Sequence, residues 1–260
     1  MHHLEGMEAV VRALRYALVL VGTVVMTMAG SGTAAVAGVA SPTERFTVRS
    51  MQPAPGDVVG VAQPVIVEFT KPVADRVAAE RSIDIASTKS VTGGFSWVNN
   101  LVVQWVPDGF WPAHADVTVV AAGVPMKFGT GAAVVGVADI SAHTFTVSID
   151  GQVVRQMPAS MGKPGFATPV GTFSALEKQR TVTFDSRTIG IPLGDPEGYL
   201  IKGEYAVRVT WGGVYIHSAP WSTGSQGYAN VSHGCINLSP DNAAWYFNNV
   251  RTGDPVIVRW

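Results

Sequence analysis

Short segments in which apolar residues occupy every second position predict a mainly β structure for most of the chain. One such segment covers residues 65–69. Two apolar runs, residues 95–98 and 101–105, flank the pair Asn99-Asn100. Because asparagine tolerates positive φ angles, this arrangement predicts a β-hairpin.

The rest of the first half continues this pattern. A further strand is predicted over residues 117–122, and only residues 77–82 could form a short helix. His114 is isolated in the sequence, and we expect it in a solvated loop. Short strands separated by turn residues are typical of an immunoglobulin-like sandwich, which we place at residues 41–136.

A second β-rich domain is predicted over residues 137–260. Residues 144–149 alternate, and Asp150-Gly151 after them is a strong hairpin signal. Residues 205–211 alternate again, and a partner strand over residues 214–216 brings His217 to its end. We interpret the Gly- and Ala-rich stretch 129–136 as the connector between the two domains.

The end of the chain carries one clear helix signal. Ser239 supplies an N-cap hydroxyl and Pro240 stands at the first helical position, so we expect a short helix that continues over residues 243–250. A last strand follows at residues 255–260. Between residues 181 and 202 the alternation weakens and polar residues mix with glycine, which indicates either a lid over a cleft or a plain surface excursion.

Composition excludes some classes of protein. The 260 residues are 47% hydrophobic and 14% charged, with a formal net charge of −1. This balance favours packed domains over disorder. No run of Lys or Arg appears, so we expect no nucleic-acid partner.

The first forty residues differ from the rest. An apolar run over residues 17–28 follows two arginines and precedes small residues with an A-x-A cleavage pattern at 35–37. These features predict a secretory signal peptide over residues 1–40, or an uncleaved membrane anchor. Either form would export the rest of the chain to the periplasm or cell wall and limit membrane contact to this segment.

Cys235 is the only cysteine in the chain. Exported proteins usually use cysteine in disulfide pairs, so a lone thiol there needs a chemical reason. The thiolate is the nucleophilic form, and a free thiol has a pKa of ~8.5. An imidazole within hydrogen-bond reach can take the thiol proton and later donate it to a leaving amine.

Two histidines could serve this thiol. His217 ends a predicted strand 18 positions before Cys235, so two adjacent strands could bring them together, and we favour it as the base. His233 lies two positions from the thiol, and we assign it an orienting or substrate-side role. Gly234 suits a tight or positive-φ backbone, and the N–H groups of Gly234 and Cys235 could bind an oxyanion.

Two other interpretations compete with a nucleophile. Cys235, His217 and His233 could hold a metal, but they are only three ligands and lack the C-x-x-C pattern common in zinc sites. Alternatively, both histidines are structural. Either would leave the lone exported thiol unexplained, so the residues indicate an exported cysteine acyl-transfer enzyme or peptidase.

The spacing resembles a known family signature. His217, about fifteen residues and then Ser232-His233-Gly234-Cys235-x-Asn237 are similar to the signature of L,D-transpeptidases with a YkuD-type catalytic domain. Residues 161–163 and 168–173 resemble the upstream conserved segment of that family. The preceding sandwich resembles the immunoglobulin-like module of mycobacterial and other actinobacterial members. The implied fold is an N-terminal immunoglobulin-like β-sandwich followed by a β-rich YkuD-type catalytic domain with a short helix.

The resemblance also implies a reaction. The donor would be a peptidoglycan tetrapeptide stem ending in meso-diaminopimelate and D-Ala. Cys235 would attack the carbonyl at the L-centre of the third residue and expel D-Ala. A diaminopimelate amine of a second stem would then capture the thioester and form a 3→3 cross-link. His217 would act as base and then acid, with the main-chain carbonyl of Ser218 as the third member.

The same resemblance assigns the cleft and the partners. Tyr199, Trp221, Asn237 and Ser232 would contact substrate, and His233 and Gly234 would belong to the catalytic loop. Carbapenems would acylate Cys235, and no cofactor is expected. Three alternatives stay open: an L,D-carboxypeptidase that passes the acyl group to water, a non-catalytic wall-binding protein, and an enzyme that attaches a protein to the wall.

Overall fold

The computed structural model describes residues 46–260. The predicted signal peptide or anchor at residues 1–40 lies outside the described residues. Within these residues strands dominate, and the helices are few and short. No helix within residues 46–260 is long and apolar enough to cross a membrane.

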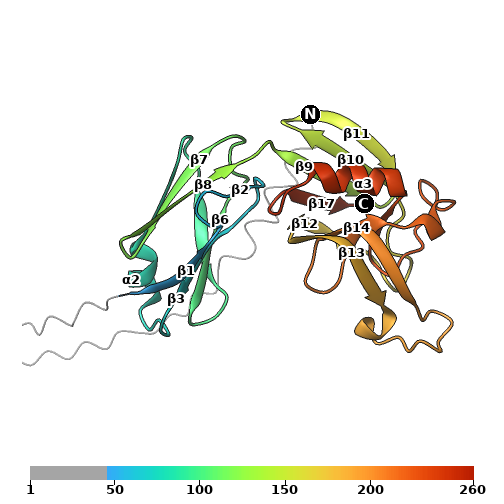
Figure 1. The fold of residues 1–260 in the computed structure, drawn as a ribbon, viewed down its shortest axis with the longest axis horizontal. Coiled ribbons are helices and arrows are strands. Elements are labelled where there is room, and N and C mark those ends of the chain that lie inside the picture. The colour runs from blue at the N-terminus through green and yellow to red at the C-terminus, as the bar shows by residue number, and fades with distance from the viewer. Residues whose placement is uncertain (1–45) are drawn as a thin grey trace, which may run out of the picture. The chain divides into compact units, whose positions relative to one another are not determined.

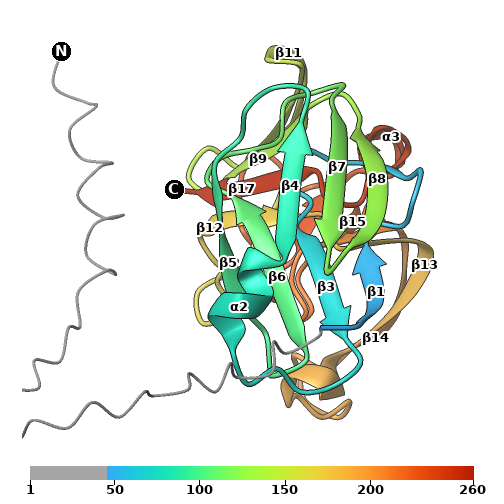
Figure 2. The same ribbon diagram turned by 90° about the vertical axis from the view of Figure 1, so that its left-hand side faces the viewer.

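The first half forms a sandwich of two four-stranded sheets, as predicted. One sheet has the order β1-β3-β6-β5: Val48–Gln52, Val65–Phe69, Val102–Pro107 and Gly93–Trp97. The other has the order β2-β8-β7-β4: Val58–Val59, Val124–Thr130, Asp116–Ala121 and Ile83–Ser87. The short helix α2, Arg76–Arg81, lies beside β4 (Figure 2) and begins where the Asp75 carboxylate accepts the N–H of Ala78.

The predicted hairpin between β5 and β6 is confirmed. The side-chain oxygen of Asn99 accepts the N–H groups of Leu101 and Val102 at 2.7 and 2.9 Å. An asparagine side chain that accepts N–H groups two and three residues ahead stabilises a turn. The two strands then run antiparallel from this turn.

The second half contains two further sheets. A five-stranded sheet has the order β11-β10-β9-β17-β12: Gln152–Pro158, Thr144–Ile149, Val134–Asp139, Pro255–Arg259 and Gly171–Ser174. A four-stranded sheet has the order β13-β14-β15-β16: Glu177–Asp185, Leu200–Arg208, Tyr215–Ser218 and Ile236–Leu238. Helix α3, Pro240–Asn249, lies against β14 (Figure 1) and β15, and Ser239 caps it as predicted.

Two sequence-based boundaries were wrong. Most of the stretch 129–136 is strand, because β8 ends at Thr130 and β9 begins at Val134. Likewise β13 and β14 extend into the predicted lid, so only residues 186–199 lie outside them, at the tip of the gold-to-orange hairpin in Figure 1. Much of β13 is solvent-exposed, so it does not need the apolar alternation that marks a half-buried strand.

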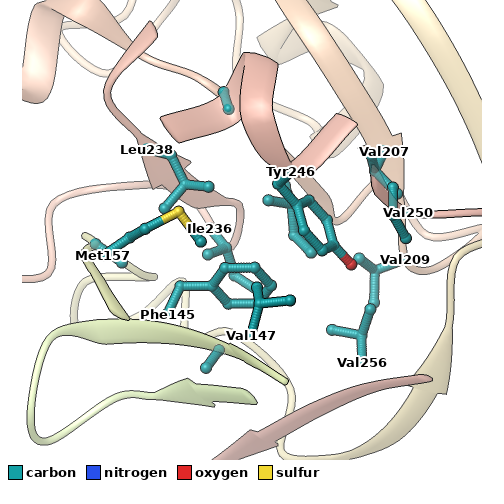
Figure 3. Packing of buried hydrophobic residues seen from close by; sticks show 14 of the residues in the cluster. Phe145, Val147, Met157, Val207, Val209, Ile236, Leu238, Tyr246, Val250 and Val256 are labelled. Carbon is teal, nitrogen blue, oxygen red and sulfur yellow. The ribbon is translucent and has the colours of Figure 1, made fainter. Parts of the chain in front are cut away.

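A tightly packed core fixes the strand that follows Cys235. Ile236 and Leu238 are fully buried, and Figure 3 shows them near the rings of Phe145 and Tyr246. Those rings pack edge to face with centroids 4.9 Å apart. Gly136 allows this approach, because a Cβ there would lie 2.5 Å from Cζ of Phe145. The residue after the nucleophile therefore has little freedom to move.

His114 lies in a turn, in line with the predicted solvated loop, and it contacts a carboxylate far away in the sequence. Its Nε2 lies 3.1 Å from Oδ2 of Asp150, while Oδ1 of Asp150 accepts the N–H of Ala133 at 2.8 Å. The sequence did not predict this contact, because Asp150 is 36 positions away and no local pattern reveals it. The side chain is nevertheless exposed, as expected.

Asp254 is a fully buried carboxylate. Its Oδ2 accepts the N–H of Arg251 at 2.6 Å, and its Oδ1 has no hydrogen-bond partner among residues 46–260. Burial raises the pKa of this carboxyl to about 6, because the charged form is poorly solvated. The charged form of Asp254 therefore costs stability at neutral pH.

Candidate active site

Two neighbouring strands bring His217 and Cys235 to one cavity. Strands β15 and β16 pair in parallel with His217 opposite Asn237, and Cys235 immediately precedes β16. Both side chains line a cavity of about 440 Å³, which is large enough for a small ligand. The adjacent-strand arrangement expected from the sequence is therefore what the structure shows.

The tautomer of His217 is set by a main-chain carbonyl. Its Nδ1 lies 2.8 Å from the carbonyl oxygen of Ser218. Because a carbonyl can only accept, Nδ1 carries the proton and the neutral ring keeps a bare Nε2. Burial lowers the pKa of His217 to about 4, and the hydrogen bond to Ser218 opposes this shift only in part. His217 is therefore a neutral acceptor near pH 7.

The thiol of Cys235 is also neutral in the resting structure. Burial raises its pKa to about 11, and a hydrogen bond from the backbone of Tyr215 opposes the shift. The sulfur lies 3.8 Å from the carbonyl oxygen of Gly213, to which it donates. Both shifts favour a thiol–imidazole pair over a thiolate–imidazolium pair.

Hydroxyl groups hold the loop that carries the nucleophile. Ser232 Oγ donates to the carbonyl of Cys235 at 2.6 Å and accepts the N–H of Gly234 at 3.1 Å. Gly234 has a φ of 117°, which an L side chain rarely adopts. The Gly234 N–H, expected from the sequence to bind an oxyanion, is thus occupied by Ser232. The N–H of Cys235 remains the stronger candidate for that role.

Residues 186–199 carry a charged contact to the catalytic loop. Glu197 contacts Lys163 and lies 3.0 Å from Nε2 of His233. These two partners lower the pKa of the Glu197 carboxyl, the Lys163 hydrogen bond most strongly. The ring of His233 also contacts those of Phe166 and Tyr199, with centroids 4.6 and 5.0 Å away. Tyr199 and Glu197 therefore close one side of the cavity over His233.

Sequence reasoning gave Glu197 and Lys163 no role. They are 34 positions apart: Lys163 lies in the segment 161–163 that resembles the family, and Glu197 lies in the possible lid, but nothing in the sequence pairs them. Phe184, whose ring centroid lies 4.5 Å from that of His217, was also missed. Its place in a strand that the alternation did not reveal explains the omission.

Asn237 leaves an unused acceptor beside the cavity. Its Nδ2 donates at 3.2 Å to Oγ of Ser222, whose own hydrogen goes to the carbonyl of Ala219. This network fixes the amide orientation, because Ser222 Oγ can only accept from Asn237. The Oδ1 atom of Asn237 is buried and has no hydrogen-bond partner within residues 46–260. Trp221, half exposed, lines the same cavity.

The alternative of a metal site gains no support. In the described part of the chain, no three His, Cys, Asp or Glu side chains lie together in a way that could hold a metal ion. His233 instead contacts Glu197, and Nδ1 of His217 contacts Ser218.

The fold and the cavity define a β-rich domain in which one thiol and one neutral imidazole line the same cavity. Comparison with protein families gives the same class. Residues 133–258 match the L,D-transpeptidase catalytic domain, and residues 27–124 match a bacterial Ig domain.

Individual relatives are similar to this chain in sequence and structure over most of its length. The chain is 58% identical over 247 residues to L,D-transpeptidase 1 of Mycobacterium tuberculosis, covering 95% of this chain and 98% of the relative. It is 61% identical to the solved structure of the LD transpeptidase LdtMt1 in complex with imipenem, with a TM-score of 0.79 over 82% of this chain and 99% of that one. An L,D-transpeptidase structure from Mycobacterium smegmatis is 64% identical, with a TM-score of 0.78 over 83% and 99% of the two chains.

The chain therefore belongs to the L,D-transpeptidase family, with an Ig-like domain before a YkuD-type catalytic domain. Members of this family are acyltransferases, and this protein is an enzyme of that type.

Proposed function

We propose that this enzyme cross-links peptidoglycan stems through a thioester on Cys235. The observation that carries the proposal is the unprotonated Nε2 of His217, whose Nδ1–H donates to the Ser218 carbonyl, at the cavity that Cys235 also lines. The donor is a tetrapeptide stem ending in diaminopimelate and D-Ala. The acceptor is the diaminopimelate side-chain amine of a second stem, and the product is a 3→3 cross-link.

The first half-reaction starts from a neutral pair. The thiol proton moves to Nε2 of His217 as sulfur attacks the stem carbonyl, so no free thiolate accumulates. The tetrahedral intermediate collapses when the C–N bond breaks, and the leaving D-Ala amine takes the proton back from His217. In the second half-reaction the acceptor amine attacks the thioester, gives a proton to His217, and thiolate leaves to be reprotonated by it.

The cavity offers groups suited to a peptide substrate. The unpaired Oδ1 of Asn237 would accept a substrate amide N–H, which satisfies a buried acceptor that otherwise costs free energy. Trp221 and Tyr199 supply aromatic surface, and Ser232 also lines the cavity. The segment carrying Tyr199 and Glu197 would limit water near the thioester and favour attack by the amine.

β-Lactams would use the same first step. Relatives have been solved in complex with imipenem and with a faropenem-derived adduct. In this protein, opening of the lactam ring by Cys235 would form a thioester from which the ring nitrogen cannot diffuse away. Carbapenems would therefore inactivate the enzyme by acylation.

The site of action follows from the substrate. Peptidoglycan lies outside the cytoplasmic membrane, and the apolar segment at residues 17–28 supplies a signal or anchor for export. We place the catalytic domain in the periplasm or cell wall on that basis.

Two measurements test the proposal. Purified protein incubated with imipenem should gain one drug mass by intact mass spectrometry, whereas Cys235→Ala should gain none. Since Cys235 is the only cysteine, the assignment is unambiguous. A folded wild-type protein that gains no mass would refute the nucleophile.

The second measurement separates the acyl acceptors. Disaccharide-tetrapeptide substrate should yield a cross-linked dimer and free D-Ala. A tripeptide without dimer would instead identify a carboxypeptidase. Wild-type protein that binds peptidoglycan but yields neither dimer nor tripeptide nor free D-Ala would identify a non-catalytic wall-binding protein.

A further inference from the structure

Thr168 touches the nucleophile loop at a position that the catalytic motif does not include. It is 2% exposed and lies 66 positions before Gly234. Its hydroxyl accepts the N–H of Gly162 at 2.9 Å and donates to the carbonyl oxygen of Gly234 at 2.9 Å. Because a hydroxyl has one hydrogen and a carbonyl can only accept, these roles are fixed.

The bond to Gly234 has a directional consequence. The carbonyl of Gly234 and the N–H of Cys235 belong to one peptide plane, and in a trans peptide they point in opposite directions. Holding that carbonyl against Thr168 therefore aims the Cys235 N–H away from Thr168. The N–H of Gly234 cannot take over, because Ser232 Oγ occupies it.

The segment that carries Thr168 is itself held against the loop. Gly162 bridges to Ser232, and the N–H of Lys163 donates to the Ser232 carbonyl at 3.0 Å. A Cβ at Gly162 would lie 2.0 Å from the carbonyl oxygen of Phe166, so this close turn requires glycine. The segment that carries Thr168 is therefore rigid, and a rigid support is required to orient a hydrogen-bond donor accurately.

We propose that Thr168 is a positioning residue that orients the Cys235 N–H toward the oxyanion of the acyl-transfer intermediates. As sulfur bonds to the carbonyl carbon, the carbonyl π electron pair moves to oxygen, and that oxygen accepts from the Cys235 N–H. When the oxyanion collapses, the amine leaves with the proton held by His217. The proposal rests on the acyl-transfer function proposed above.

Two reactions of the same thiol distinguish a loss of oxyanion stabilisation from a general loss of thiol reactivity. Acylation by imipenem passes through an oxyanion, whereas alkylation by iodoacetamide displaces iodide and forms none. Removal of one oxyanion donor typically costs about 10²–10³-fold in rate, so its misorientation in Thr168→Val should slow the maximal acylation rate by about tenfold or more. The alkylation rate and the apparent KI for imipenem should change by less than about threefold, since neither depends on the oxyanion.

Matched variants complete the test. Thr168→Ser keeps the hydroxyl and should acylate within about threefold of wild type, whereas Thr168→Ala, a second hydroxyl-free variant, should behave like Thr168→Val. In ¹⁵N-labelled wild type, the amide proton of Cys235 should move downfield on acylation, a measurement that needs no variant.

The outcomes that overturn the proposal are distinct. An acylation rate of Thr168→Val equal to that of wild type would refute the positioning role. So would equal losses in its acylation and alkylation rates, slow acylation of Thr168→Ser, or an unchanged chemical shift of the Cys235 amide proton on acylation. Failure of wild type itself to acylate would instead refute the proposed function.

Discussion

The raised pKa of Cys235 predicts how fast its thiol is alkylated and how that rate depends on pH. A thiol with a pKa of about 11 is ionised to only about one part in 10⁴ at pH 7. A free thiol with a pKa of ~8.5 is ionised to about 3% at that pH. Alkylation of folded protein at pH 7 should therefore be roughly two orders of magnitude slower than alkylation of the unfolded chain. Its rate should rise about tenfold per pH unit from pH 7 to 9.5.

Iodoacetamide and intact mass spectrometry measure this directly. The single cysteine gives one mass shift, and the same protein in urea supplies the free-thiol control. Restricted access would lower every rate but leave the slope against pH unchanged. His217→Ala should also keep the slope, because the neutral imidazole does not create the resting thiolate, yet it should slow imipenem acylation by about 10²–10⁴-fold. A rate independent of pH between 6 and 8 would refute the neutral pair and establish a preformed thiolate–imidazolium pair.

Two further predictions concern charged groups. Glu197→Gln removes the charge that holds residues 186–199 to Lys163 and His233. The KI for imipenem should therefore rise about threefold to tenfold, while the melting temperature stays unchanged. A lower melting temperature with an unchanged KI would contradict this role. The carboxyl of Asp254 has a pKa of about 6 in the folded protein, above its unfolded value near 3.8. Its contribution to the free energy of unfolding is therefore fully present below pH 4 and is lost as pH rises through 6. Relative to Asp254→Asn, wild type should lose about 2 kcal/mol of unfolding free energy between pH 4 and 7, measured by urea denaturation; parallel pH curves for the two proteins would contradict the shift.

Local signals explain which parts of the fold were predictable. The Asn99 turn, the Asp150-Gly151 turn and the Ser239 cap each depend on residues within a few positions, and the structure contains all three. Strands β3, β5, β6 and β7 of the sandwich were equally readable, because one face of each meets a core, whereas β1, β2, β4 and β8 were not predicted. Strand β13 was missed because none of its residues is buried and its sequence shows little apolar alternation.

In the candidate site too, the relations within a compact motif were predictable from the sequence and the long-range contacts were not. The pairing of His217 with Cys235 could be expected from a compact motif and from the tendency of adjacent strands to end together. The contacts of Thr168 with Gly234 and of Glu197 with His233 join positions 66 and 36 apart. Such contacts depend on register and loop path, which no periodicity in the sequence reports. The supporting residues of the site were therefore accessible only in three dimensions.

A neutral resting pair suits the exported location proposed for this enzyme. Oxidants attack the thiolate rather than the thiol, so a lone cysteine with a raised pKa resists oxidation outside the cell. The cost is a weak nucleophile in the absence of substrate. Proton transfer to His217 during attack, together with an N–H aimed at the developing oxyanion, restores reactivity only when an acyl carbonyl is bound. Hydrogen bonds that aim this N–H, such as that of Thr168, therefore matter more here than in an enzyme with a preformed thiolate.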